Sequence, residues 1–221
     1  MVLILKTPRR QILGDDVYEQ LKALIMDSSI EPGARLNIED LARRLEVSPT
    51  PVREALARLE SEGLTVKLPL KGYRTTDLLD AHDLVELYDL RLLLEGPSAR
   101  RAAENVTEEQ ADALRAEMHS VGEIPAEHRY EDYLPLTAHD VRLHQLILGG
   151  AGNDMVRQAF IRTHCHLHIF RLTYGRPSGV HTITEHSAVV EAIVSGDGEA
   201  AEQAMRNHLT LSRDRVLAGI A

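Results

Sequence analysis

Four side chains in the second half of the sequence have the types and spacing to hold a metal ion. Asp140 and His144 stand at positions i and i+4, so on a helix both project from one face. His186 opens a later helical segment, and His208 lies inside the last one. One carboxylate and three imidazoles form an ordinary ligand set for Zn²⁺ or another divalent transition ion. The alternative is chance spacing of core histidines, because all 11 histidines follow residue 76.

A second histidine-rich tract, HCHLH, competes for the same role. It holds His164, Cys165, His166 and His168, and its first and last histidines share a helix face. Such density is typical of a binding tract, although one or two rings could face a pocket while the others face solvent. Cys165 is the single cysteine of the chain and cannot form an internal disulfide, which suits a reducing cytoplasm.

These candidate ligands require an all-helical scaffold, because no strand-like alternation follows residue 76. Thr107 and Gln110 form a capping box, and Pro97 predicts a kink inside a long helix. The pattern predicts an antiparallel bundle of about six helices. Their expected bounds are Asp80–Asn105, Glu108–Val121, Asp132–Leu148, Asp154–Tyr174, Ile183–Ser195 and Gly198–Ala218.

A step in composition predicts two domains, residues 1–76 and 77–221. The first holds 12 Lys+Arg against 11 Asp+Glu, and the second holds 13 against 23. The acidic total of −9 does not exclude DNA binding, since a local basic face attracts phosphate. The opening MVLIL is not preceded by basic residues, and no apolar run approaches the ~20 residues of a membrane span. We therefore expect a cytoplasmic protein with no membrane partner.

The first domain has the element order of a winged helix-turn-helix. The periodicity predicts a first helix over Asp15–Ser28, capped by Asp15 or Asp16. Asn37 and Ser48 are the expected caps of the next two helices. The chain is thus expected to be mainly α, with the winged helix-turn-helix followed by the helical bundle.

The third helix has the composition of a recognition helix. Thr50 and Arg53 share an outward face near its start, where such helices read base edges in the major groove. Two β-prone runs follow, Thr65–Leu68 and Tyr73–Thr76, and Lys71 stands at the tip of the hairpin between them. Solvated charge is the alternative role for the basic residues. The pattern favours DNA binding.

The first domain closely resembles the GntR family of bacterial transcription regulators. The resemblance rests on PGARL, LARRLEVSPTPVREAL, LESEGL and KGYRT, which cover nearly all of residues 11–76. It implies a homodimer on a palindromic double-stranded DNA operator. A Thr-Arg pair of the best-known fatty-acid-responsive member is replaced here by Ser48-Pro49, so that operator sequence cannot be transferred. The DNA-contacting positions that the resemblance implies are Arg35, Ser48, Thr50, Arg53, Lys71 and Gly72.

The second domain resembles the effector-binding FCD domain of the FadR-like branch. The resemblance rests on RLLLEGPSARRAA, HDVRLHQLIL, GN, EHSAVVEAIVSGD and AMRNHL, which cover most of residues 80–215. In many members four residues that match Asp140, His144, His186 and His208 bind a metal beside a small carboxylate effector. Arg91 matches an arginine near that effector, and its forked donors suit a carboxylate. The alternative for Arg91 is a salt bridge to Glu95.

The leading hypothesis is a transcriptional regulator controlled by a small organic acid, and not an enzyme. The expected cofactor is a divalent transition metal, Zn²⁺ ahead of Ni²⁺ or Mn²⁺. Three alternatives remain: a direct metal-ion sensor, a constitutive DNA binder whose bundle only dimerises, and a metallohydrolase fused to a DNA-binding module. Glu185 is the best general-base candidate for the hydrolase. The residues do not distinguish a repressor from an activator.

Overall fold

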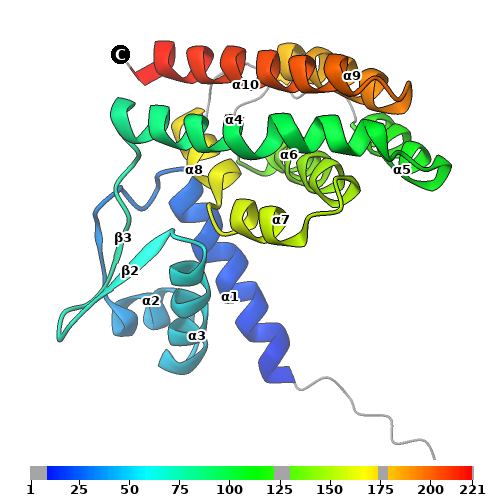
Figure 1. Ribbon diagram of the computed structural model, residues 1–221. Coiled ribbons are helices and arrows are strands. Elements are labelled where there is room, and N and C mark those ends of the chain that lie inside the picture. Colours follow the sequence, from blue (N-terminus) through cyan, green and yellow to red (C-terminus); the bar gives the residue numbers. More distant parts are fainter. Residues whose placement is uncertain (1–8, 122–129, 174–178, 221) are drawn as a thin grey trace, which may run out of the picture. The chain divides into compact units, whose positions relative to one another are not determined.

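The computed structural model describes residues 9–121, 130–173 and 179–220. The chain divides into two compact units, Met1–Leu78 and Leu79–Ala221, whereas composition placed the boundary after residue 76. Figure 1 shows a first unit of helices with a small sheet and a second unit built of helices. No helix in the described part of the chain is long and apolar enough to cross a membrane.

The first unit is a winged helix-turn-helix. Its core forms where α1 packs on α3, through fully buried side chains such as Leu21, Ile25 and Leu56. The three-stranded antiparallel sheet has the order β1-β3-β2. The elements are α1 (Arg9–Met26), β1 (Arg35–Leu36), α2 (Ile38–Arg44), α3 (Pro49–Ser61), β2 (Thr65–Leu68) and β3 (Gly72–Thr75).

Local sequence explains most of the boundaries in this unit. Asn37 caps α2 as expected, and its side chain accepts hydrogen bonds from the backbone of Glu39 and Asp40. Ser48 is at the N-cap of α3, but its side chain makes no capping bond, and Pro49 occupies the first turn instead. The expectation that Asp15 or Asp16 caps the first helix is wrong, because α1 begins at Arg9 and both lie inside it.

The wing contains one strand more than the sequence predicts. The pairing of β2 with β3 matches Thr65 with Thr75 and Leu68 with Gly72. The added strand β1 pairs Arg35 with Arg74 on the other edge of β3. A two-residue strand has no periodicity of its own, so only the partner strand reveals it.

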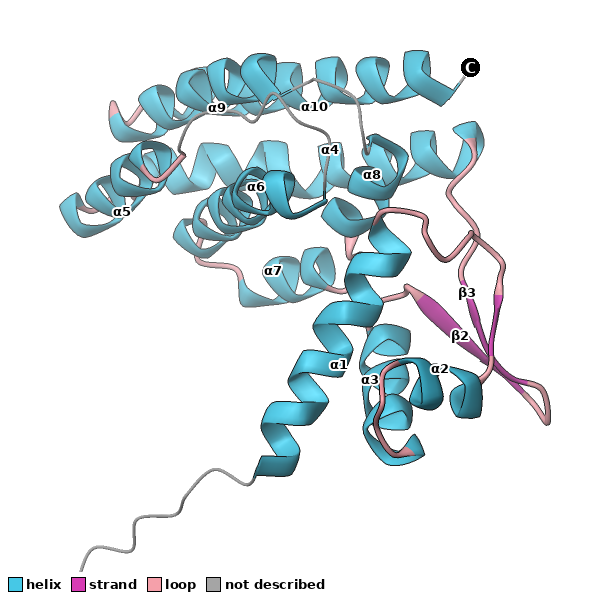
Figure 2. Cartoon of the chain, turned by 180° about the vertical axis from the view of Figure 1, so that it is seen from behind, coloured by secondary structure: helices cyan, strands magenta, loops and turns pink. Residues whose placement is uncertain are grey.

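The second unit is a helical bundle. Its longest helices, α4 and α10, pack along each other, with α9 beside α10 and α6 against α4 (Figure 2). Fully buried Leu84, Leu143, Ile193 and Leu209 form part of its core. The described helices are α4 (Ala81–Glu104), α5 (Glu108–His119), α6 (Tyr130–Gly150), α7 (Asp154–Ile161), α8 (Cys165–Thr173), α9 (Gly179–Val194) and α10 (Gly198–Ile220).

The mainly helical fold and the bundle of about six helices are confirmed, with one division that the sequence did not predict. The helix expected over Asp154–Tyr174 is two helices, α7 and α8, because the backbone of His164 takes a left-handed φ of 47°. The Thr163 hydroxyl accepts from the amide of Cys165 and so starts α8. The capping box of Thr107 and Gln110 is confirmed.

Candidate metal centre and DNA-reading face

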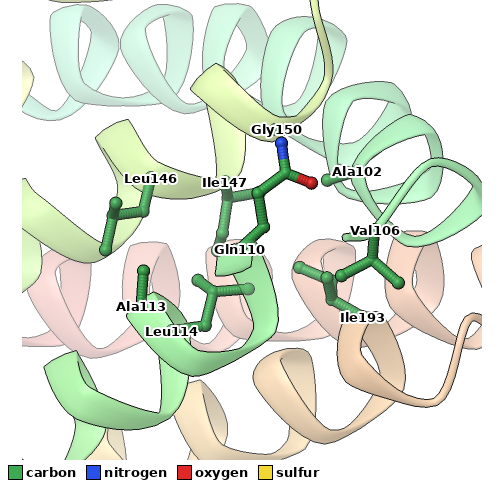
Figure 3. Close-up of a pocket in the computed structure, with 9 residues that line it drawn as sticks. All are labelled: Ala102, Val106, Gln110, Ala113, Leu114, Leu146, Ile147, Gly150 and Ile193. Atoms are coloured by element: carbon green, nitrogen blue, oxygen red, sulfur yellow. The ribbon is translucent and has the colours of Figure 1, made fainter. Parts of the chain in front are cut away.

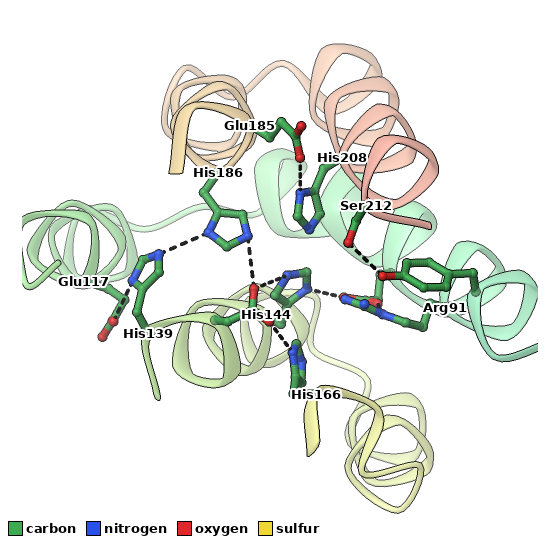
Figure 4. Close-up of polar contacts among 12 residues, drawn as sticks. Arg91, Glu117, His139, His144, His166, Glu185, His186, His208 and Ser212 are labelled. Carbon is green, nitrogen blue, oxygen red and sulfur yellow. Dashed lines mark hydrogen bonds and ion pairs between the residues drawn. The ribbon is translucent and has the colours of Figure 1, made fainter. Parts of the chain in front are cut away.

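The four residues singled out as metal ligands lie together in the second unit. Helix α6 carries Asp140 and His144 one turn apart, α9 carries His186, and α10 carries His208. One ligand atom from each lies within 4.8 Å of every other. The three imidazoles are at most 2% exposed. Figure 4 shows the three helices meeting at this point. Residues separated by up to 68 positions thus share one buried site.

Two ring nitrogens of this cluster face the carboxylate of Asp140. Asp140 Oδ1 lies 3.6 Å from His144 Nε2 and 3.3 Å from His186 Nε2. Within the described part of the chain, both Nε2 atoms are buried without a hydrogen-bond partner. Leaving buried polar atoms unpaired is costly, and a metal ion that accepts their lone pairs removes that cost. The donor set therefore fits a divalent cation.

The other nitrogen of each imidazole is held from outside the cluster. His144 Nδ1 contacts Glu95 Oε2, and His208 Nδ1 donates to Glu185 Oε2 at 3.0 Å. His186 Nδ1 lies 3.1 Å from His139 Nε2. Such outer partners fix ring orientation and tautomer in metal sites. None of these partners is predicted from the sequence, although Glu95 stands four residues after Arg91 and Glu185 stands directly before His186.

Burial and charge keep His144, His208 and Asp140 in the protonation states that bind a metal. Burial lowers the pKa of His144 to about 3, despite the opposing effect of Glu95. Burial also lowers the pKa of His208. Burial alone would raise the pKa of Asp140, but the neighbouring His166 and its hydrogen bond hold that pKa well below the usual range. Neutral imidazoles and an ionised carboxylate are the protonation states that a metal requires.

Arg91 forms the salt bridge that the sequence offered as its alternative role. Its Nε donates to Glu95 Oε1 at 2.6 Å, and both side chains are at most 3% exposed. Burial would raise the pKa of Glu95, but the charge of Arg91 and the contact with His144 lower it below the usual range. Arg91 Nη2 remains buried without a hydrogen-bond partner in the described residues. The salt bridge thus leaves one donor of the guanidinium unused.

The HCHLH tract contributes to the same cluster. His166 Nδ1 lies 2.5 Å from Asp140 Oδ2, the carboxylate oxygen that does not face the other histidines. Its Nε2 is buried and has no hydrogen-bond partner in the described part of the chain. Cys165 is buried, with Phe160 in its apolar cluster. Among the described residues, only the set with Asp140 gathers three or more possible ligands.

A small cavity lies elsewhere in the bundle, between α4, α5, α6 and α9 (Figure 3). It measures about 50 Å³, and Gln110 is the one polar side chain among apolar residues such as Leu114, Ile147 and Ile193. Ligand pockets usually measure about 300–1,000 Å³. This cavity therefore does not fit an organic acid.

In the first unit, the residues proposed to contact DNA lie on α3, its cap and the wing. Arg53 is exposed on α3, with its Nη2 3.5 Å from Glu39 Oε1, and Thr50 is half-buried one turn earlier. Ser48 precedes this helix and is exposed. The remaining three are on the sheet: Arg35 on β1, Lys71 at the exposed hairpin tip, and Gly72, whose φ of 83° favours glycine.

A winged helix-turn-helix is a DNA-binding module, and here it is followed by a separate helical bundle. Residues 13–74 match the family of bacterial regulatory proteins named gntR, and residues 86–211 match the FCD domain. The chain belongs to the GntR family, with an N-terminal GntR helix-turn-helix and a C-terminal FCD domain. This is a family of transcriptional regulators, not of enzymes.

Individual relatives are similar over most of their length. The chain is 28% identical to the HTH-type transcriptional regulator YdhC of Bacillus subtilis (strain 168), covering 86% of this chain and 85% of the relative. It is also 28% identical to a putative L-lactate dehydrogenase operon regulatory protein of Escherichia coli (strain K12), covering 92% and 85%. The solved structure of E. coli McbR/YncC superimposes with a TM-score of 0.66 at 21% identity, covering 93% and 97%, which supports the fold.

Proposed function

We propose that this GntR/FCD regulator binds a small organic acid beside a divalent metal in its second unit, and that the acid controls operator affinity. The observation that supports this proposal is the cluster of Asp140, His144, His186 and His208, with ligand atoms within 4.8 Å of one another. Three imidazoles and one carboxylate fill a tetrahedral site, so the acid would bind as a fifth ligand of the ion. Zn²⁺ is the proposed ion, with Ni²⁺ and Mn²⁺ as alternatives.

Two buried nitrogens border the site proposed for an anionic effector. Arg91 Nη2 and His166 Nε2 are buried, and neither has a hydrogen-bond partner in the described residues. Both side chains border Phe160, whose ring centroid lies 6.0 Å from the Arg91 guanidinium and 5.5 Å from the His166 ring centroid. A carboxylate that reaches the metal would accept from Arg91 Nη2 and offset the desolvation of that group. Arg91 is the proposed effector-binding residue.

The proposed output is a change in DNA affinity. A homodimer would place two copies of the face formed by Thr50 and Arg53 on the half-sites of a palindromic operator. The proposed DNA contacts also include Arg35, Ser48, Lys71 and Gly72. An effector that favours one packing of the second unit would alter the spacing of the two DNA-binding units, with a coupling of about 5- to 150-fold in affinity.

A direct metal sensor is the second candidate, since it uses the same ligands. The metallohydrolase is disfavoured by the position of Glu185. That carboxylate accepts from His208 at 3.0 Å and is paired with Arg215 Nη2 at 2.8 Å. These contacts outweigh burial and lower the pKa of Glu185 to about 2, so it is a poor base near neutral pH.

The test combines metal analysis with operator binding by the full chain. A high-affinity DNA site is first selected from a random duplex library, and its affinity is measured with Zn²⁺ and a panel of mono-, di- and tricarboxylates. We expect at least one acid to change affinity about fivefold or more, and Arg91→Gln to abolish the response. Arg100→Gln, an exposed arginine of the same helix, is the matched control.

Three outcomes separate the candidates. A response to Zn²⁺ alone, unaffected by any acid, favours the metal sensor. A bound acid that leaves DNA affinity unchanged contradicts the proposed switch. Absence of any bound divalent ion contradicts the metal site, whatever the DNA result.

A further inference from the structure

A chain of buried polar side chains connects α5 to the candidate metal centre. Glu117 Oε1 lies 2.9 Å from His139 Nδ1, and His139 Nε2 lies 3.1 Å from His186 Nδ1. Figure 4 shows Glu117, His139 and His186 joined in this order by dashed lines. Glu117 is 9% exposed, His139 0% and His186 1%. Helix α5 supplies none of the four proposed ligands, yet its carboxylate reaches one of them through a single ring.

The carboxylate of Glu117 determines which nitrogen donates and which accepts in the series Glu117–His139–His186. An ionised carboxylate only accepts, so the proton of a neutral His139 lies on Nδ1 and its Nε2 carries a lone pair. His186 Nδ1 must then donate to that lone pair. A neutral His186 with its proton on Nδ1 has the lone pair of Nε2 free, and Nε2 is the atom that faces Asp140 at 3.3 Å.

Neighbouring donors keep the carboxylate of Glu117 ionised, so that it accepts a hydrogen bond from His139. Arg142 donates to both of its oxygens, from Nε at 2.8 Å and from Nη2 at 2.9 Å. The Ser120 hydroxyl adds a bond of 3.1 Å to Oε1. Paired donors of this kind stabilise a carboxylate in its ionised form, so Glu117 remains an acceptor toward His139.

We propose that Glu117, acting through His139, is a positioning group that fixes the proton of His186 on Nδ1 and so prepares Nε2 to bind the metal. The inference rests on the metal site of the proposed function and deepens it. His144 and His208 contact carboxylates directly through Nδ1, at Glu95 and Glu185. His186 is the ligand whose support runs through a second ring, so its readiness to bind metal depends on α5.

The first test determines the tautomer of His186 in the metal-free full chain. Long-range ¹⁵N NMR of the imidazoles distinguishes protonated from unprotonated ring nitrogens, and a His186→Asn variant identifies the His186 signals. We expect the proton on Nδ1 in the wild type. In His139→Leu we expect this preference to be lost, because no acceptor remains beside Nδ1. A wild-type His186 that carries its proton on Nε2 would overturn the inference.

The second test compares Zn²⁺ affinities by competition with a chromophoric chelator. His139→Leu removes the relay, by which we mean the hydrogen-bonded link from Glu117 through His139 to His186. It should weaken Zn²⁺ binding about 10- to 100-fold, the usual effect of losing an outer partner. His139→Gln retains one donor and one acceptor, so it should restore most of that affinity. His82→Leu is the matched control, since His82 is exposed on α4.

The outcomes distinguish a relay from simple packing. Equal loss of affinity in His139→Leu and His139→Gln, with unchanged thermal unfolding of the metal-free chains, would overturn the inference. Wild-type affinity in His139→Leu would also overturn it. If the wild type binds no divalent ion, the proposed metal site fails, whereas the tautomer measurement still decides whether the relay exists.

Discussion

Two arginine–carboxylate pairs, one from each unit of this regulator, lie in opposite environments. In the first unit Arg58 pairs with Asp15 at 2.5 Å, and the two side chains are 49% and 61% exposed. In the second unit Arg91 pairs with Glu95 at 2.6 Å, and they are 3% and 1% exposed. Hydrated charges cost the fold little and remain available to phosphate, whereas buried charges must be compensated by their neighbours.

The two proposed functional sites therefore differ in how they depend on the fold. The side chains proposed to read DNA lie on a scaffold whose core is apolar, so they can be exchanged without loss of the fold. The candidate metal centre lies inside the bundle, so the side chains that would bind the ion also affect stability. Changes to the candidate metal centre should therefore alter folding and binding together, whereas changes to the face formed by Thr50 and Arg53 should alter binding alone.

The largest expected effect is that of removing a buried carboxylate. Glu95→Ala leaves Arg91 without its partner and His144 without its Nδ1 contact, so it should lower the free energy of unfolding by about 3–5 kcal/mol. Asp15→Ala breaks an exposed pair and should cost less than about 1 kcal/mol. Urea unfolding of the metal-free full chains measures both. Similar losses in the two variants would contradict the contrast between the units.

A smaller effect is expected from Arg53→Ala on the reading face. If Arg53 contacts a base edge, operator affinity should fall about 10- to 100-fold, equivalent to 1–3 kcal/mol, with the free energy of unfolding nearly unchanged. Arg115→Ala, which removes an exposed arginine of α5, controls for net charge. Fluorescence anisotropy with the selected operator gives the affinities. An equal loss in both variants would show that Arg53 acts only through its charge.

The smallest of the three effects is a pH dependence in the second unit. The pKa of His144 is about 3 in the folded chain and about 6.5 in an unfolded one. The unfolded state therefore binds more protons between these values, and stability must fall as pH falls below about 6.5. From pH 7.5 to pH 5.5 this single group contributes about 1.4 kcal/mol of lost stability.

Comparison with His144→Gln isolates that contribution. The variant lacks the titrating ring, so its free energy of unfolding should change less over the same range than that of the wild type. Both chains are measured without metal, because protons and metal ions compete for the imidazole. Parallel pH profiles for the two chains would show that His144 does not couple folding to protonation.

Local patterns in the sequence were sufficient for the architecture. Helical periodicity, Asn37 as a cap and the capping box of Thr107 and Gln110 act within a few residues, so they can be recognised without knowing the fold. The exposure of Arg53 on α3 could be predicted for the same reason, whereas Thr50, one turn earlier, is half-buried. The pairing of β1 and the break at His164 could not, since each depends on atoms outside the local repeat.

The sequence by itself determined the family, the two kinds of domain and the four side chains of the candidate metal centre. Only the tertiary structure decided what surrounds those side chains. His139 contacts His186 across 47 positions and Glu117 across 22, His166 contacts Asp140, and Glu95 lies between Arg91 and His144. These contacts join different helices at one buried point. The tautomers and charges that they set depend on distance in space, which spacing along the chain does not encode.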